Sequence, residues 1–415
     1  MSHPNSTLTG KLELFFEVLS DFDGCFRPAP TRLRKPFANS QNGFAVATAG
    51  SGGIDLRTAL HRRGSPIHRM GMGNGLAVSV LDLVGMRGGE TAGSAIARSV
   101  DLARHAEGLG YTRFWLAEHH SIAGLACSAT SVLIGHVAGA TRTIRVGSGG
   151  VMLPNHAPLV VAEQFGTLEA MYPGRIDLGL GRAPGGDYAT MRALRRDMGQ
   201  TGDDFPELLA ELRGYLGPEK PGQAVRAFPG QGSLVPVTLL GSSTYSAQLA
   251  ARLGLPFAFA AHFAPDDMYV ASRMYREQFR PSEVLREPHL MVAVQVIAAE
   301  TDAAAGRLFT SPQQRFLRLI RNQPVELLPP VDSMDWIWQP WEQTAVEQRL
   351  GAAIVGSDAT VKAGLEKLIG RTGADEVIVV TDLFEHADRL DSYRRVAAVA
   401  RTVAAKAAEP AYGVR

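Results

Sequence analysis

The sequence predicts an α/β protein whose strand–helix units close into a (β/α)8 TIM barrel. Apolar, strand-like runs alternate with helical segments from Leu76 onward. Two neighbouring runs also end in residues suited to a barrel mouth: Glu118-His119-His120 follows one, and Gly149-Gly150 ends the next. Because such barrels build their active sites at the C-terminal ends of their strands, we expect the chain to be an enzyme.

Each predicted strand is a short, mostly apolar run. The runs span residues 76–83, 114–117, 145–150, 176–180, 238–240, 257–260, 290–298 and 376–380. Helices are predicted between or after them at 91–109, 128–140, 159–171, 243–253, 266–279 and from 390 to about 405. The helix at 91–109 has Ala95, Leu102 and Ala106 on one face, and Gly110 is its predicted end.

The largest insertion, residues 301–350, separates the seventh strand from the last strand–helix unit. It contains Trp336, Trp338 and Trp341 among several prolines. We interpret it as an irregular excursion over the barrel mouth. Packing between the barrel and a second subunit is an alternative interpretation.

The N-terminal residues 1–72 differ from the rest of the chain. They are rich in scattered Pro, Arg, Ser and Gly, a composition that buries too little apolar surface to offset the entropy of ordering. We therefore expect a disordered extension. Met70 and Met72 directly precede the first strand, so the extension could also reflect a mis-assigned start. Residues 73–415 then form the barrel domain.

Composition narrows the possible functions. The 415 residues are 45% hydrophobic and 20% charged, with a formal net charge of +1, which argues against a nucleic-acid or anionic-membrane binder. Two cysteines do not make a disulfide framework or a four-ligand zinc site. The sequence shows neither a signal peptide nor an apolar run long enough to span a bilayer, so we expect a cytoplasmic protein.

The Glu118-His119-His120 segment is the first candidate for chemistry. An acidic residue beside two imidazoles can act in acid/base catalysis, contact a cofactor or bind a metal. Adjacent residues of an extended chain point to opposite faces, so one histidine is expected to face the mouth. A metal site would need further ligands such as His156 or His136, and we predict none. A purely structural loop pair is the remaining alternative.

The Gly149-Gly150 pair predicts a strand end where the backbone bends or a flat ligand approaches closely, although a simple turn is also possible. Arg182 follows the fourth strand and can bind a phosphate, or it can anchor a loop through an ion pair. Its surroundings, 179–185, have the wrong spacing for a Rossmann dinucleotide site.

The segment 240–246 joins a predicted strand to a helix and contains several hydroxyl residues. A helix N-terminus of this kind can bind a phosphate, unless Ser243 is an ordinary helix cap. Together with Arg182, the segment predicts a ligand with one phosphate monoester, such as FMN.

In this order, these segments resemble those of the bacterial luciferase-like flavin-dependent monooxygenases, nearest the branch of small bacterial oxidoreductases of unassigned substrate. The most specific segments are 115–120, 147–156, 162–165, 173–182 and 241–243. The resemblance implies a TIM barrel that binds reduced FMN. A separate NAD(P)H:flavin reductase would supply that cofactor, and its reaction with O2 would oxidise a small organic substrate.

The resemblance also assigns residues. It matches the active-site histidine to His119 and the flavin-contacting strand, which has an unusual cis peptide in luciferase, to Gly149 and Gly150. Phosphate contacts are matched to Arg182, Ser243 and Ser246. Two features differ: Ser242 stands where luciferase has an acidic residue, and the long luciferase lid has no clear match.

Three further expectations follow from the resemblance. A hydride-transfer oxidoreductase that uses the deazaflavin F420 is the main alternative, and a flavin-binding protein without turnover is a second. Relatives commonly form homodimers through helices near strands two and three. The sequence does not identify the substrate.

Overall fold

The computed structural model describes residues 75–183, 188–194 and 204–404. Within this part of the chain, eight parallel strands close into a barrel, with β1 beside β2 and β9, and β6 beside β7. The barrel strands are β1 (Ala77–Asp82), β2 (Arg113–Leu116), β3 (Arg145–Met152), β4 (Ile176–Gly181), β5 (Val237–Gly241), β6 (Phe257–Ala260), β7 (Leu290–Ala298) and β9 (Glu376–Val380). The predicted (β/α)8 barrel is confirmed.

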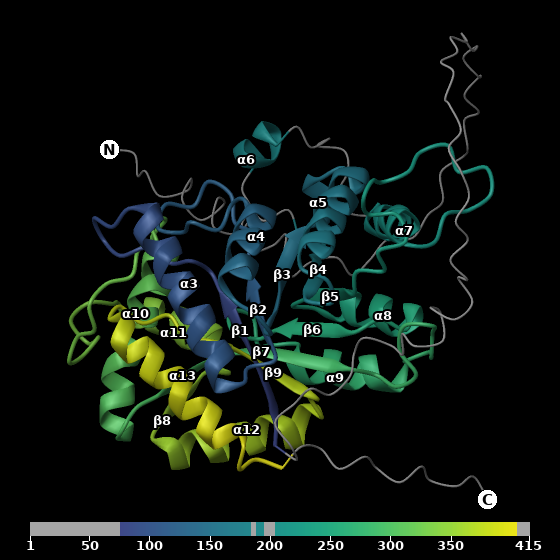
Figure 1. Ribbon diagram of the computed structural model, residues 1–415. Helices are drawn as coiled ribbons and strands as arrows, with labels where there is room; N and C mark the ends of the chain where they lie inside the picture. Colours follow the sequence, from purple (N-terminus) through teal and green to yellow (C-terminus); the bar gives the residue numbers. More distant parts are fainter. Residues whose placement is uncertain (1–74, 184–187, 195–203, 405–415) are drawn as a thin grey trace, which may run out of the picture.

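Helices surround the strands, with α8 and α9 at the right of Figure 1 and α10 and α13 at the left. They are α3 (Ala92–Leu109), α4 (Thr130–Ala140), α5 (Pro158–Met171), α6 (Tyr188–Ala193), α7 (Phe205–Leu216), α8 (Thr244–Leu253), α9 (Met268–Glu277), α10 (Asp302–Ile320), α11 (Pro340–Arg349), α12 (Asp358–Thr372) and α13 (His386–Ala400). Gly110 ends α3 as predicted, with φ 83°, and the side chain of Thr91 caps the first turn of the helix. No helix in the described ranges has the length and apolar character to cross a bilayer.

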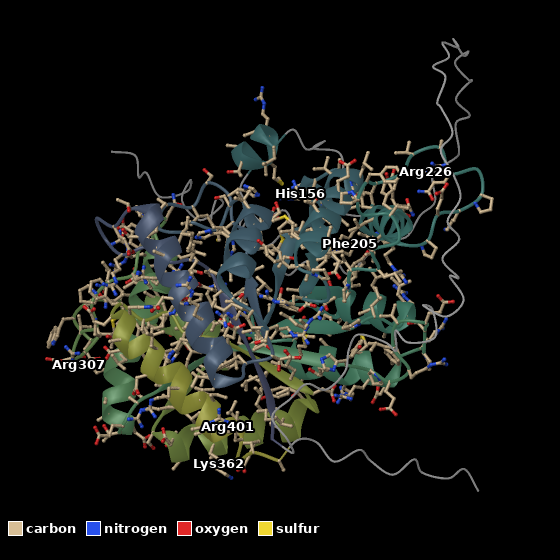
Figure 2. The ribbon with its side chains drawn as sticks, in the orientation of Figure 1. His156, Phe205, Arg226, Arg307, Lys362 and Arg401 are labelled. Atoms are coloured by element: carbon tan, nitrogen blue, oxygen red, sulfur yellow. The ribbon has the colours of Figure 1, made fainter. Side chains whose placement is uncertain are left out.

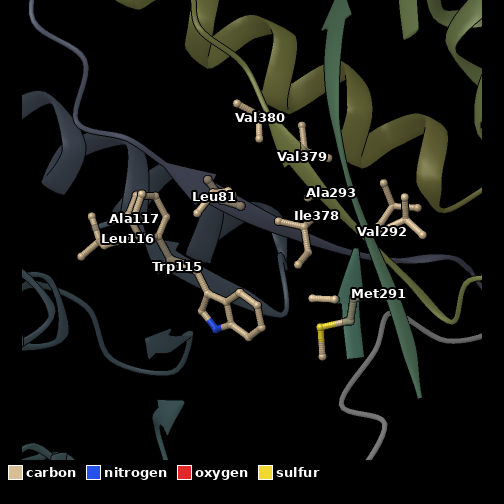
Figure 3. Close-up of a cluster of buried hydrophobic side chains, with 14 of the residues drawn as sticks. Leu81, Trp115, Leu116, Ala117, Met291, Val292, Ala293, Ile378, Val379 and Val380 are labelled. Atoms are coloured by element: carbon tan, nitrogen blue, oxygen red, sulfur yellow. The ribbon is translucent and has the colours of Figure 1, made fainter. Parts of the chain in front are cut away.

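Strands far apart in the sequence share one core. Figure 3 shows Leu81 of β1, Trp115 of β2, Met291 of β7 and Ile378 of β9 among the buried apolar side chains of this cluster. Trp115 is fully buried, and its indole nitrogen donates a hydrogen bond to Asp177 at 3.2 Å. The apolar runs of the sequence are therefore the walls of the barrel.

A network of buried charges fills the N-terminal end of the barrel. The guanidinium of Arg113, on β2, donates to Asp177 of β4 at 2.8 Å and to Glu376 of β9 at 2.8 Å. Ser79 of β1 also donates to Glu376. The network connects four strands across the barrel.

The region between β7 and β9 corrects two predictions. The segment 301–350 is not irregular as a whole, because α10 and α11 lie within it and pack around their own apolar cluster, which includes Trp338. A short strand, β8 (Ile354–Gly356), was not predicted and pairs with β7 outside the barrel ring. Helices α7 and α12 were also not predicted from the sequence.

Residues 323–331 of this insertion cross the loops that follow β1 and β2. The backbone N–H of Val325 donates to the carbonyl of Ala123, and that of Leu327 donates to the carbonyl of Met86. These loops lie at the C-terminal ends of their strands, so this part of the insertion packs at the rim of the barrel mouth, on the side of β1 and β2. The predicted extension, residues 1–72, lies outside the described residues.

Candidate active site

The Glu118 carboxylate ties the end of β2 to the end of β3. Its Oε1 accepts hydrogen bonds from Nε2 of His120 and Nε2 of His156, both at 2.9 Å, and its Oε2 accepts one from the backbone of Met152 at 3.2 Å. Figure 2 labels His156 at the upper side of the barrel. His120 is thus hydrogen-bonded to Glu118, whereas no hydrogen bond joins the adjacent His119 to this carboxylate in the described structure.

Hydrogen bonding sets the charge of this group. Burial by itself raises the pKa of Glu118, but the hydrogen bonds from His120 and His156 outweigh burial and lower it to about 2. The same contact raises the pKa of His120. Glu118 is therefore a carboxylate near neutral pH.

Glu118, His120 and His156 also offer three ligand atoms that lie within 4.8 Å of one another, which is a set that could hold a metal ion. Hydrogen bonds already account for the contacts of the carboxylate, and we retain the prediction that no metal is bound. His136, the other possible ligand, lies exposed on α4 and outside this group.

His119 has the electrostatics of a neutral base. Burial, and next the charge of Arg315, lower its pKa to about 4. His262, which follows β6, also has a pKa lowered to about 4 by burial, and the charge of His119 adds to that effect. Two imidazoles that are neutral at pH 7 therefore come from β2 and β6.

The Gly149-Gly150 pair lies inside β3 and not in a turn. The peptide bond between the two glycines is cis, and the β3–β4 register shifts between Ser148 and Val151. A Cβ atom on Gly150 would lie 2.8 Å from the carbonyl oxygen of Gly179, and one on Gly149 would lie 2.8 Å from Leu81. A side chain at Gly150 would therefore meet fixed backbone, whereas one at Gly149 would first meet the end of a leucine side chain.

Arg182 and the start of α8 lie together, as the sequence predicts. The guanidinium of Arg182 stacks on the ring of Tyr245 in α8, 4.1 Å from its centroid. No ion pair to Arg182 is found among the described residues. Ser243 is the N-cap residue of α8, but its hydroxyl makes no capping hydrogen bond. Ser246 is buried in the first turn, close to Gly241.

This geometry agrees with what sequence comparison finds. The sequence model of luciferase-like monooxygenases matches residues 76–400. The chain belongs to the luciferase-like monooxygenase family. Its resemblance to that family is thereby confirmed.

Family members of high identity cover the barrel and nearly their own full length. The uncharacterized protein YvbT of Bacillus subtilis (strain 168) is 56% identical over 323 residues, which are 78% of this chain and 96% of YvbT. A luciferase-like monooxygenase of Escherichia coli (strain K12) is 53% identical over 318 residues, 77% of this chain and 95% of the relative. An N-acetyl-S-alkylcysteine monooxygenase of B. subtilis (strain 168) is 32% identical over 325 residues, 77% of this chain and 96% of the relative.

Several solved structures share the fold. The crystal structure of apo-MsnO8 has a TM-score of 0.69 and 36% identity and covers 80% of this chain and 99% of its own. The oxygenating constituent of 3,6-diketocamphane monooxygenase from Pseudomonas putida, in complex with FMN, has a TM-score of 0.63 and 19% identity. The match covers 80% of this chain and 100% of that structure. An F420-dependent secondary alcohol dehydrogenase has a TM-score of 0.59 and 14% identity, and the match covers 79% of this chain and 99% of that structure. The last two likenesses show the fold alone.

Several polar residues at the mouth of this luciferase-like barrel are not predicted from the sequence. They are Asp82 at the end of β1, His262 after β6, Gln295 in β7, Asp382 after β9 and Arg315 of α10. The first four could have been found, since each interrupts or follows an apolar strand run, as His119 does. Arg315 gives no local signal, because it is one of several arginines in an amphipathic helix.

Proposed function

We propose that this chain is an FMN-dependent monooxygenase that uses reduced flavin and O2 to oxidise a small organic substrate. The observation that carries the proposal is the pairing of Arg182 with the N-terminus of α8, where Ser243 does not cap its own helix. A guanidinium, two hydroxyls and helix N–H groups form a donor set suited to a phosphate monoester. These residues therefore fit FMN.

The remaining mouth residues suit a planar cofactor beside a proton acceptor. Gly149 and Gly150 offer bare backbone, and we assign this backbone to the flavin ring. His119 is neutral above about pH 4, so it can take up a proton near the reacting atoms. When bound, reduced FMN would supply two electrons, so that one atom of O2 enters the substrate and the other leaves as water.

The test couples the purified protein to an NAD(P)H:flavin reductase, which we propose as its partner. We expect O2 consumption that depends on an organic substrate, with one atom of 18O2 found in the product. S-alkylated N-acetylcysteines are the first compounds to test, because a relative 32% identical is named for them. Binding of F420 in preference to FMN would favour the hydride-transfer alternative. Flavin binding without turnover on any compound would favour a flavin store.

Arg182 supplies a separate test of the cofactor site. Arg182→Ala should weaken FMN by roughly 1.5–3 kcal/mol, as for the loss of a hydrogen bond to a charged group, and should leave riboflavin affinity nearly unchanged. Fluorescence titration measures both affinities. Arg226→Ala, on the surface beside Glu219, is the matched control. Equal weakening of FMN and riboflavin would remove Arg182 from the phosphate site.

We also propose a homodimer, because α4 and α5 expose apolar side chains. Val132 of α4 is 69% exposed, and Val160 and Met171 of α5 are 44% and 57% exposed. Helix α4 has no Asp, Glu, Lys or Arg. Sedimentation should show a dimer that Val132→Lys shifts towards the monomer, and a monomeric wild type would reject the proposal.

A further inference from the structure

Unpartnered polar atoms gather on one side of the barrel mouth. Among the described residues, the buried side-chain atoms without a hydrogen-bond partner include His262 Nδ1, Gln295 Oε1 and both Nη atoms of Arg315. They come from the segment after β6, from β7 and from α10, whereas the residues assigned to the flavin phosphate follow β4 or begin α8. Buried polar groups are nearly always hydrogen-bonded, so such a cluster offers hydrogen bonds to water or to a polar ligand.

Asp382 places two of these groups side by side. Its Oδ2 lies 2.9 Å from Nη1 of Arg315, in an ion pair whose angle does not make a hydrogen bond, and it accepts a hydrogen bond from Nε2 of Gln295 at 3.4 Å. Since the carboxylate needs a donor, the Gln295 amide must turn its nitrogen towards Asp382. The Oε1 of Gln295 and Nη2 of Arg315 therefore remain open as an acceptor beside a donor.

Charge balance limits the ligand. Arg315 is neutralised by Asp382, and Asp82 is paired with Arg389 at 2.9 Å. Arg315 and Gln295 are 5% and 1% exposed, so water screens an added charge poorly. A carboxylate or phosphate would bring an unbalanced negative charge, whereas a neutral group would not.

We propose that Arg315 and Gln295 form a subsite for a neutral carbonyl next to an N–H, the edge of a carboxamide or imide. Nη2 of Arg315 donates to the carbonyl oxygen, and Oε1 of Gln295 accepts from the N–H. This subsite extends the proposed function. It depends on FMN binding only if the carbonyl and N–H belong to the flavin. One source of this edge is the pyrimidine ring of the flavin, and the other is an amide group of the substrate.

The first arm of the experiment tests the flavin source. FMN and 3-methyl-FMN, which lacks the ring N–H, are titrated against the wild type, Gln295→Met, Arg315→Lys and the control Arg307→Lys on the outer face of α10. If the edge is the flavin's, methylation weakens binding to the wild type about tenfold, and Gln295→Met removes that difference. Arg307→Lys should keep it.

The second arm tests the substrate source. N-methylacetamide and methyl acetate are compared by ligand-observed NMR on the wild type and Gln295→Met, with and without FMN. If the edge is the substrate's, 3-methylation has no effect, and the wild type binds N-methylacetamide but not methyl acetate. Gln295→Met should lose this binding.

Two results overturn the subsite: the wild type shows neither preference, or Gln295→Met keeps the preference that the wild type shows. Thermal unfolding identifies variants that fail to fold. If Arg315→Lys fails to fold, the result for Gln295→Met alone decides whether the subsite exists. A protein that binds no FMN contradicts the proposed function, while the arm without flavin still tests the subsite.

Discussion

Glu118 and His119 are neighbours in sequence, yet their surroundings make Glu118 charged and His119 neutral near pH 7. Hydrogen bonds from two imidazoles hold Glu118 as an anion, although it is only 2% exposed. Burial and a nearby guanidinium keep His119 neutral. At the residue scale, the site therefore separates a charged group that positions strand ends from an uncharged group that is free to take up a proton.

Replacement of His119 tests that division. His119→Ala should retain FMN, because the residues assigned to the phosphate are untouched, and should lower product formation about 10²–10⁴-fold while O2 is released as hydrogen peroxide. Product and peroxide are measured per O2 consumed. His136→Ala, on the exposed face of α4, is the control. Full coupled turnover by His119→Ala would exclude His119 from the reaction.

The pH dependence follows from the lowered pKa of His119. Because burial lowers this pKa from its usual 6.5 to about 4, the imidazole stays neutral until the pH falls through about 4. Coupled turnover should therefore persist below pH 6.5. The unfolded chain takes up this proton near pH 6.5, so the contribution of His119 to stability is complete above that pH and decreases as the pH falls towards 4. Turnover lost with an apparent pKa near 6.5 would contradict this environment.

At the element scale, the sequence predicts the barrel strands well because each is a buried apolar run. It fails where burial is not apolar or where an element is short. Helix α10 contains Pro312, a residue that is rare inside helices, and β8 has three residues. The subsite residue Arg315 is not predicted, because only the packing of α10 shows which arginine turns inward.

Gly150 shows a second limit of sequence reasoning. The sequence leads us to expect that a side chain here would fill flavin space and spare the fold. The expectation that the fold is spared is wrong, because the Cβ would meet the backbone of Gly179 at 2.8 Å. Gly150→Val should destabilise the β3–β4 pair by about 1–3 kcal/mol, as overpacking does. Denaturant unfolding measures this. Gly214→Ala in α7, where nothing lies within 4 Å of the added Cβ, should not destabilise.

At the scale of the whole molecule, the two ends of the barrel differ in how they treat buried charge. At the N-terminal end, Arg113 is hydrogen-bonded to Asp177 and Glu376. At the C-terminal end, atoms of Gln295 and Arg315 lack partners. An unpaired buried polar group costs about 1–3 kcal/mol. The C-terminal end also holds a buried ion pair, Asp82 with Arg389, so the two ends differ in the unpartnered atoms of Gln295 and Arg315, where we propose that a ligand binds.

Residues 1–72 should be dispensable for the barrel. The first described residues already pair with the last helix region: the backbone N–H of Leu76 donates to the carbonyl of Ala400, and Gly75 bridges Ala404. A chain that starts at Met72 keeps these contacts. Its melting temperature and FMN affinity should equal those of the full chain. A marked loss of either would show that the extension packs on the barrel.

The N-terminal network allows a sharper test of where stability resides. Arg113→Met removes the only guanidinium that joins Asp177 to Glu376 in the described structure, and it leaves the buried Glu376 with contacts to His289 and Ser79 but no arginine. Breaking a buried pair in this way costs about 3–5 kcal/mol. Glu376 has a strongly lowered pKa: burial opposes this, and the charge and hydrogen bonds of Arg113 and His289 together outweigh burial. Without Arg113 the pKa rises, so the variant should regain part of its stability as the pH falls. Denaturant unfolding at several pH values measures this, and Arg307→Met on the exposed face of α10 should change little. A variant as stable as the wild type would mean that the barrel does not depend on this network.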